Sequence, residues 1–319
     1  MTFSIDAFDN KTLELIILPT EECNFRCTYC YEDFAIGKMS PKIVEALKRF
    51  ITKRAEELSN VSIEWFGGEP MLEYGIVTDV MDHTQRLFGG KSLNGSMTTN
   101  ASLLDEKRFR KLVSLGVSSY QISLDGLPID HDMTRKNRGG NGTFDKIWQN
   151  LTQICEIKDL DFSILLRVHF SPEKLANLPK FIVMLDEAFG HDERFRIFLK
   201  PIGRYGGEND GVIEELSKIE EEQVFSQLLS LRPNIKMEDG TRGATMKNMP
   251  VCYAAKANAF VVRANGLLSK CTVDLRSQKN LVGKINDNGS LDLDVQKMKY
   301  WLRGHNNGKV ENLYCPAHT

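Results

Sequence analysis

The chain has 319 residues, and its 41 lysines and arginines nearly balance its 43 aspartates and glutamates, which leaves a formal net charge of −2. This balance lacks the basic excess typical of nucleic-acid-binding proteins, and no apolar stretch approaches the roughly 18 residues of a membrane span. The first residues, MTFSIDAFDNKTLEL, do not form a secretory signal, because no long apolar run follows a basic region. We therefore expect a cytoplasmic protein with neither nucleic acid nor membrane as a partner, whose seven cysteines bind metal rather than form disulfides.

Strand-like and helix-like patterns alternate from residue 13 to about residue 201. The predicted strands span residues 13–18, 61–66, 96–99, 117–125, 161–170 and 195–201. The predicted helices span residues 40–58, 74–88, 105–115, 144–158 and 172–189. Ser40 and Pro41 at the start of the first helix are typical of a helix N-terminus. The alternation predicts an α/β fold with a parallel sheet and right-handed crossovers, but periodicity does not decide whether the sheet closes.

The inner face of this sheet is predicted to be polar. Side chains two residues apart share a face of a strand, and the face that helices cover is apolar in a parallel sheet. If Ile122, Leu124 and the equivalent apolar residues of the next two strands face the helices, these residues face inward: Gln121, Ser123, Asp125, Arg167, His169, Arg196 and Lys200. A purely structural barrel interior is filled with branched aliphatic side chains, so this interior is typical of one that holds a charged ligand.

Cys23, Cys27 and Cys30 occur in the run CNFRCTYC, just after the first predicted strand. A [4Fe–4S] cluster needs four ligands, and cysteine thiolate is the usual one. Because only three cysteines are local, one iron is left free to chelate a small molecule, as a reactive cluster requires. The alternative is a structural zinc site on the C-x2-C pair of Cys27 and Cys30. Zinc usually has a second ligand pair, and the next cysteine or histidine is His83.

With Tyr29 just before its last cysteine, this C-x3-C-x2-C run resembles the signature of the radical S-adenosylmethionine (SAM) superfamily. The resemblance implies a partial (β/α)6 barrel of the TIM type. It also implies that the amino and carboxylate groups of SAM bind the open iron. One electron from the cluster then cleaves SAM to methionine and a 5′-deoxyadenosyl radical, which abstracts a hydrogen atom from the substrate. A protein such as flavodoxin or ferredoxin is the implied reductant.

The segment Gly67, Gly68, Glu69 and Pro70 follows the second predicted strand directly. Glycines allow the backbone to approach a ligand closely, and exposed carbonyls together with Glu69 can accept hydrogen bonds from an ammonium group. In the resembled family this GGEP segment binds the amino group of SAM. The alternative is an ordinary turn of glycine and proline.

The SLDG segment that begins at Ser123 ends the fourth predicted strand, where parallel barrels place their chemistry. It resembles the SLDG segment of that family, and Ser123 and Asp125, on one face of the strand, can bond ribose hydroxyls. Arg135 can pair with the methionyl carboxylate, because a guanidinium matches a carboxylate in shape. Thr98 and Asn100, in a TTN run, resemble the segment near the adenosyl group.

Four further residues have weaker assignments. Arg167 and His169 face the lumen by strand parity and are candidates for a catalytic or substrate contact, with structural pairing as the alternative. His131 is assigned to a loop rather than to catalysis. Cys155 falls on the apolar stripe of a predicted helix, so we expect it in the core.

The C-terminal region contains Cys252, Gly266 and Cys271 in the pattern C-x(9–15)-G-x4-C, followed by Cys315. This pattern resembles the opening of the auxiliary-cluster domains called SPASM and twitch. A full SPASM domain has more cysteines, so we expect one auxiliary [4Fe–4S] cluster on Cys252, Cys271 and Cys315. His318 is the candidate fourth ligand, since imidazole can bind iron. An open site that binds substrate, another oxygen or nitrogen ligand, and a domain without metal are the alternatives.

Three regions are expected along the chain: a partial barrel over residues 1–205, a linker with a bridging helix over residues 206–250, and a small auxiliary-cluster domain over residues 251–319. The chain begins a few residues before its first strand, so we expect no fused leader-binding domain. Leader recognition would then need the exposed surface or a separate protein.

The motifs together predict a radical SAM oxidoreductase that modifies a peptide. The SLDG stretch and the C-x(9–15)-G-x4-C opening resemble maturases of ribosomally synthesised and post-translationally modified peptides (RiPPs). The expected partner is a precursor peptide that becomes cross-linked, epimerised or oxidised. The alternatives are a radical SAM dehydrogenase or rearrangement enzyme that acts on a small metabolite, and a sulfatase maturase of the formylglycine type.

Overall fold

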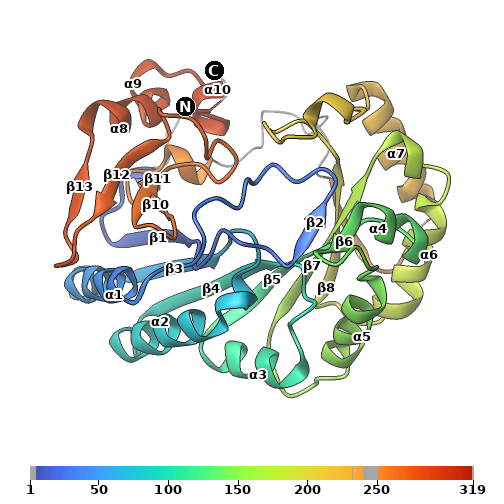
Figure 1. Cartoon of the computed structure of the whole chain (residues 1–319), viewed down its shortest axis with the longest axis horizontal. Coiled ribbons are helices and arrows are strands. Elements are labelled where there is room, and N and C mark those ends of the chain that lie inside the picture. The colour runs from blue at the N-terminus through green and yellow to red at the C-terminus, as the bar shows by residue number, and fades with distance from the viewer. Residues whose placement is uncertain (1–4, 232, 240–250, 318–319) are drawn as a thin grey trace.

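A curved sheet of 11 strands forms the centre of the molecule (Figure 1). The computed structural model describes residues 5–231, 233–239 and 251–317. In spatial order the strands are β13 (Leu291–Leu293), β12 (Leu281–Ile285), β11 (Leu267–Ser269), β10 (Ala259–Val262), β1 (Thr12–Ile17), β3 (Asn60–Trp65), β4 (Ser92–Thr99), β5 (Val117–Leu124), β7 (Ser163–Phe170), β8 (Phe195–Pro201) and β9 (Lys236–Asp239). Neighbours from β10 to β9 are parallel, and β10 to β13 pair antiparallel. Within the described residues the sheet is open, because β13 and β9 are its two edges.

All six strands predicted from the sequence are present, as β1, β3, β4, β5, β7 and β8. The prediction started the third of them at residue 96, whereas β4 begins at Ser92. Pairing with β3 extends over Ser92 and Asn94, whose polar side chains carry no strand pattern. Strand β9 and the four C-terminal strands were not predicted.

Helices cover the outer face of the sheet (Figure 1). They are α1 (Pro41–Ala55), α2 (Tyr74–Leu87), α3 (Glu106–Ser114), α5 (Phe144–Cys155), α6 (Leu178–Phe189) and α7 (Lys218–Ser230). The Ser40 side chain caps α1 by accepting a hydrogen bond from the Ile43 amide. The predicted helix 172–189 is divided into η3 (Pro172–Lys174) and α6, because Pro179 suits only the first turn of a helix.

Shorter helices complete the chain. Helix α4 (Pro128–Thr134) follows β5 and was not predicted, and α8 (Val295–Trp301), α9 (Arg303–Asn307) and α10 (Glu311–Tyr314) lie beside the C-terminal strands (Figure 1). The remaining single turns are η1 (Ile5–Phe8), η2 (Pro70–Glu73), η4 (Asp210–Val212) and η6 (Tyr253–Ala255). None of the helices in the described part of the chain combines the length and the apolar composition needed to cross a bilayer.

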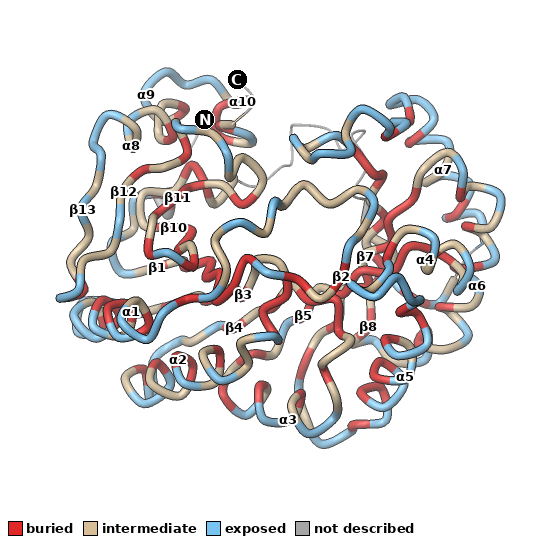
Figure 2. Tube along the Cα trace, in the orientation of Figure 1, coloured by how far each residue is buried: buried red, intermediate tan, exposed pale blue. Residues whose placement is uncertain are grey.

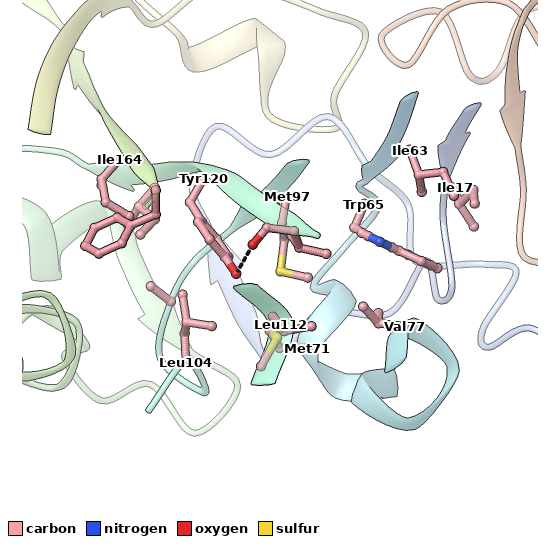
Figure 3. Close-up of a cluster of buried hydrophobic side chains, with 14 of the residues drawn as sticks. Ile17, Ile63, Trp65, Met71, Val77, Met97, Leu104, Leu112, Tyr120 and Ile164 are labelled. Carbon is pink, nitrogen blue, oxygen red and sulfur yellow. Dashed lines mark hydrogen bonds between the residues drawn. The ribbon is translucent and has the colours of Figure 1, made fainter. Parts of the chain in front are cut away.

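The core lies between the sheet and its covering helices, and buried residues run along the strands in Figure 2. The predicted outward-facing side chains are at most 1% exposed: Ile122, Leu124, Leu166, Val168, Phe170, Phe195, Ile197 and Leu199. Figure 3 shows part of this layer, where Trp65, Met97 and Tyr120 lie near Val77 of α2 and Leu112 of α3. Strand parity therefore predicted the covered face correctly.

Two pairings place the cysteine-bearing segments. Strand β2 (Phe25–Cys27) pairs antiparallel with β6 (Arg135–Asn137), so that Cys27 lies opposite Arg135. Strand β10 pairs parallel with β1. Residues 251–317 therefore extend the sheet of the N-terminal region rather than begin a new one.

Candidate functional site

A cavity of about 510 Å³ lies at the C-terminal ends of the parallel strands. Residues from each predicted cofactor segment line it: Cys23, Cys27, Tyr29, Cys30, Gly67, Gly68, Thr98, Thr99, Asn100, Ser123 and Arg135. Arg167, His169 and Lys200, predicted to face inward, line it too. Its volume is within the range of small-molecule sites. The fold thus brings segments that are far apart in sequence to one cavity.

The cysteine loop follows β1 and is held by hydrogen bonds that each involve at least one backbone group. The Phe25 amide donates to Cys23 Sγ over 3.3 Å, and the Thr28 amide donates to the Thr134 carbonyl over 2.9 Å. The exposed Arg26 guanidinium donates to the carbonyls of Cys23 and Phe25 over 2.8 and 2.6 Å. These contacts set the loop conformation that presents the three thiols to the cavity.

The three thiols are protonated unless a cation binds them. Burial raises the pKa of Cys23 to about 12 and that of Cys30 to about 12, and it also raises the pKa of Cys27. A bound metal removes such a proton, because the thiolate is the ligand. In the described part of the chain no three His, Cys, Asp or Glu side chains surround one point as ligands of a single ion do. The ligands of a cluster bind different irons and do not need to share such a point.

Gly67 and Gly68 are required by the packing of the cysteine loop. Gly67 has a φ of +104°, and a Cβ there would lie 2.4 Å from the Thr20 carbonyl oxygen. A Cβ at Gly68 would lie 2.3 Å from the Glu22 carbonyl oxygen and 2.9 Å from the Cys23 amide nitrogen. The backbone at both glycines therefore lies close to the protein's own backbone in the cysteine loop, where a close approach to a ligand was expected. Both glycines also line the cavity.

Glu69 and Pro70 lie outside the cavity lining. Glu69 is 0% exposed, and its carboxylate accepts hydrogen bonds from the Thr99 hydroxyl (2.7 Å), the Asn100 amide (2.7 Å) and the Met71 amide (3.0 Å). Pro70 begins η2. The expected role of Glu69 as an acceptor for a ligand ammonium group stays a prediction; in the structure its oxygens bond the end of β4 to the segment that follows β3.

Asp125 is the centre of a buried polar network that joins the cysteine loop to β5. Its carboxylate accepts hydrogen bonds from the Tyr29 hydroxyl over 2.8 Å and from the Thr134 hydroxyl over 2.7 Å. Arg135 Nη1 donates to the same Tyr29 hydroxyl over 2.7 Å. Lys174 Nζ lies 3.6 Å from the carboxylate. The loop is thereby fixed at Tyr29, between two of its cysteines.

The charge state of Asp125 follows from these contacts. Burial acts to raise its pKa, but the hydrogen bond with His169 and the charges of Arg135 and Lys174 outweigh burial and hold the pKa below the usual range. Asp125 is 1% exposed and does not line the cavity, whereas Ser123 does. The expected pairing of both side chains with a ribose stays a prediction, and the structure places only Ser123 in the cavity wall.

The two candidate residues of β7 differ from each other. His169 lies 3.3 Å from the Tyr29 hydroxyl and 3.4 Å from the Asp125 carboxylate, and burial lowers its pKa to about 4, so it is neutral near pH 7. His169 therefore forms the structural pairing that was the alternative to a catalytic or substrate contact. Arg167 lines the same cavity, and its buried Nε has no hydrogen-bond partner among the described residues.

The two residues assigned away from the site are both buried. His131 lies in α4 rather than in a loop, with Nδ1 3.2 Å from the Asp125 amide and Nε2 3.1 Å from the Thr143 hydroxyl. Cys155 is 3% exposed and belongs to the hydrophobic core, as predicted.

Cys252, Cys271 and Cys315 come together in the C-terminal region. The Cys252 amide donates to the Leu313 carbonyl over 2.9 Å, which brings it to the segment that ends at Cys315. Burial raises the pKa of Cys252 to about 11, and the neighbouring thiols of Cys271 and Cys315 add to this rise. His318 lies outside the described residues.

Part of the cavity wall is formed by residues that were not predicted from the sequence. Tyr31 and Glu32 follow Cys30 directly, and Thr272 and Val273 follow Cys271; all four line the cavity. Their only sequence signal is that each pair is adjacent to a candidate ligand. Their position shows that the C-terminal region borders the same cavity as the N-terminal cysteines.

Comparison with known proteins gives a family match. The sequence model described as Radical SAM superfamily matches residues 17–178. A GTP 3′,8-cyclase of Clostridium perfringens is 27% identical over 284 residues, with 83% of this chain and 82% of the relative covered. A cysteine-type anaerobic sulfatase-maturating enzyme of the same species is 26% identical over 212 residues, with 59% of this chain and 56% of the relative covered.

Solved structures share the fold. The structure titled native anSMEcpe with bound AdoMet and Cp18Cys peptide has a TM-score of 0.67 at 20% identity, covering 95% of this chain and 88% of that chain. Streptococcus suis SuiB bound to precursor peptide SuiA has a TM-score of 0.66 at 15% identity, covering 94% and 68%. These likenesses confirm the predicted partial-barrel fold of the mostly parallel sheet.

Proposed function

Because this chain belongs to the radical SAM superfamily, we propose that it binds a [4Fe–4S] cluster and SAM in the cavity and modifies a peptide. The observation that carries the proposal is the shared cavity. All three cysteines of the C-x3-C-x2-C run open into it, together with Gly67, Gly68, the TTN segment, Ser123 and Arg135. When bound, the cluster supplies an electron that cleaves SAM, and the resulting 5′-deoxyadenosyl radical abstracts a hydrogen atom from the substrate.

The residues present fit both groups. Three thiols supply three of the four ligands of a cluster and leave one iron for SAM. Arg135 lines the cavity opposite Cys27, and its buried Nε has no acceptor among the described residues, so it has a donor left for the methionyl carboxylate. Under this proposal the Gly67 and Gly68 carbonyls accept from the amino group, and Ser123 binds the ribose.

A peptide substrate is supported by the neighbours and by the cavity wall. anSMEcpe and SuiB were each solved with a peptide bound. The wall at Thr272 and Val273 belongs to the region of Cys271, where we propose one auxiliary [4Fe–4S] cluster with Cys252 and Cys315 as further ligands. We further propose a RiPP precursor peptide as partner, with a flavodoxin or ferredoxin as reductant in the cytoplasm.

A small-molecule substrate is the second candidate. The match to GTP 3′,8-cyclase covers 82% of that relative, against 56% for the sulfatase-maturating enzyme. Both candidates share the chemistry at the three N-terminal cysteines. They are distinguished by mass spectrometry of anaerobic reactions that contain SAM, a reductant, and either a candidate precursor peptide or GTP. A mass change in GTP alone contradicts the peptide assignment.

Replacing Cys271 with alanine tests the auxiliary cluster. The variant is expected to lose about half of the reconstituted iron and all modified product, but to retain 5′-deoxyadenosine formation without substrate, because the N-terminal cysteines are untouched. Iron assay, mass spectrometry and chromatography of 5′-deoxyadenosine provide the three readouts. Full product formation by the variant would show that this cluster has no part in the chemistry.

Replacing Tyr29 with phenylalanine tests the positioning of Arg135. The change removes the hydroxyl that accepts from Arg135 and donates to Asp125. We expect SAM affinity to fall by about tenfold, as for the loss of one hydrogen bond to a charged group. Equilibrium dialysis with the reconstituted protein measures the affinity. Tyr74→Phe is the matched control, since no described residue bonds its hydroxyl and it does not line the cavity; an equal loss in both variants contradicts the assignment.

A further inference from the structure

We infer that Arg167 binds a carboxylate group of the substrate. The inference rests on the proposed function, because it names the chemistry of the substrate in the same cavity. Arg167 lies on the inner face of β7 and lines the cavity. In the sheet register it lies beside Ser123 of β5 and Phe198 of β8. Its guanidinium therefore faces the same space as the proposed SAM site.

Arg167 has no counter-charge of its own. Within the described part of the chain it forms no hydrogen bond or ion pair, and its Nε is buried without an acceptor. The other guanidinium groups nearby are bound: Arg135 donates to Tyr29, and Arg263 Nε donates to Glu21 over 3.1 Å. A buried charged donor without an acceptor costs free energy. A ligand that accepts from Arg167 removes this cost.

A carboxylate is the group that the cavity favours. The guanidinium fork matches the two oxygens of a carboxylate and can bind both. The cations that line the cavity are Arg135, Arg167 and Lys200, and the acids are Glu32 and Glu64. Burial raises the pKa of Glu64, which favours its neutral form. The positive charges therefore outweigh the negative ones around the space that a substrate would occupy.

Arg135, rather than Arg167, is placed to serve the cofactor. Arg135 lies opposite Cys27 in the β2–β6 pair and is tied to Tyr29 in the cysteine loop. Arg167 has no bond to that loop among the described residues. The neighbouring His169 is neutral and already bound to Tyr29 and Asp125. Among the described residues Arg167 is thus the inner-face guanidinium left for the substrate.

The test measures binding rather than turnover. Reconstituted enzyme with SAM is titrated anaerobically, by ligand-observed NMR, with capped glycine pentapeptides that carry a central glutamate or a central glutamine. A third peptide has the glutamine and a free C-terminal carboxylate, and GTP is the fourth probe. We expect one of the carboxylate peptides to bind about 10- to 100-fold more tightly than the capped glutamine peptide, the range for charged hydrogen bonds. The peptide that does so identifies a side-chain or a terminal carboxylate.

Variants assign the preference to one residue. Arg167→Gln is expected to abolish it and Arg167→Lys to retain part of it, since lysine keeps the charge without the fork. Arg196→Gln is the matched control: Arg196 lies on the inner face of β8, pairs with Glu238 and does not line this cavity, so the preference is expected to persist.

Several outcomes overturn the inference. They are equal binding of the peptides, no binding of any carboxylate probe, tighter binding of GTP than of every peptide, and a preference that survives Arg167→Gln. A loss of SAM affinity in Arg167→Gln as large as the loss of peptide preference would assign Arg167 to the cofactor instead. If the enzyme shows the carboxylate preference but does not cleave SAM, the result supports the Arg167 site and contradicts the proposed function.

Discussion

Replacing Cys27 with alanine is expected to reduce 5′-deoxyadenosine formation to background. Cys27 lies between the other two cysteines of the loop, lines the cavity and faces Arg135 across the β2–β6 pair. With two thiols left, the N-terminal cluster loses the set of ligands that leaves one iron free for SAM. Iron and sulfide assays on the anaerobically reconstituted protein, with chromatography of the SAM products, measure both losses.

Cys155→Ala is the matched control for this experiment. Cys155 is a buried cysteine on α5, in the hydrophobic core on the covered side of the sheet. The control is expected to keep its iron and its SAM cleavage. Normal 5′-deoxyadenosine formation by Cys27→Ala would contradict the assignment of the SAM-cleaving cluster to the three N-terminal cysteines. Zinc in place of iron in the wild type would instead favour the structural zinc alternative.

Replacing Asp125 with alanine is expected to lower the free energy of unfolding by about 3–5 kcal/mol, the cost of removing one partner of a buried ion pair. Asp125 is the carboxylate that lies within 3.9 Å of Arg135 and 3.6 Å of Lys174, all of them buried. The change also removes the acceptor of the Tyr29 hydroxyl. Urea unfolding followed by tryptophan fluorescence measures the loss.

The sign of the pH dependence follows from the lowered pKa of Asp125. A group whose folded pKa lies below its unfolded pKa stabilises the protein above the unfolded value. The contribution of Asp125 is therefore fully present at neutral pH, and it decreases as the pH falls below the range in which an unfolded aspartate titrates.

Two comparisons separate the structural role of Asp125 from a ribose contact. Asp125→Asn keeps hydrogen-bonding oxygen but not charge, so its loss should be smaller than that of alanine. Asp159→Ala removes an exposed partner of Arg110 and should change stability much less. If Asp125→Ala weakens SAM binding but leaves the unfolding free energy unchanged, the original ribose assignment is correct and the network described here does not stabilise the fold.

The strands, the covering helices and the cysteine run were predictable because their signals are local. The alternation of Ile122 and Leu124 with polar neighbours depends only on the two-residue period of a strand. The strands that were missed, or predicted too short, depend on pairing with a neighbouring strand rather than on a side-chain pattern. Strand β4 begins at Ser92 because β3 pairs with it there. Strand β6 exists because β2 lies beside it.

The candidate site shows the same limit. Motif membership grouped Glu69 and Asp125 with the cysteine loop, but it did not reveal the bonds that they form within the protein. The structure bonds Glu69 to Thr99 and Asn100, and Asp125 to Tyr29, which is 96 residues away. A residue of such a motif can serve the packing of the site or its ligand contacts, and the residue pattern does not separate the two.

The sequence by itself determined the α/β alternation, the polar inner face and the three-thiol run, because each depends on the spacing of neighbouring residues. Only the tertiary structure decided which of the polar side chains that line the cavity already have partners within the protein and which do not. His169 is bound by Tyr29 and Asp125, while Arg167, two residues before it on the same strand face, has no described partner. The partners come from distant strands and loops, so no local pattern distinguishes the two residues.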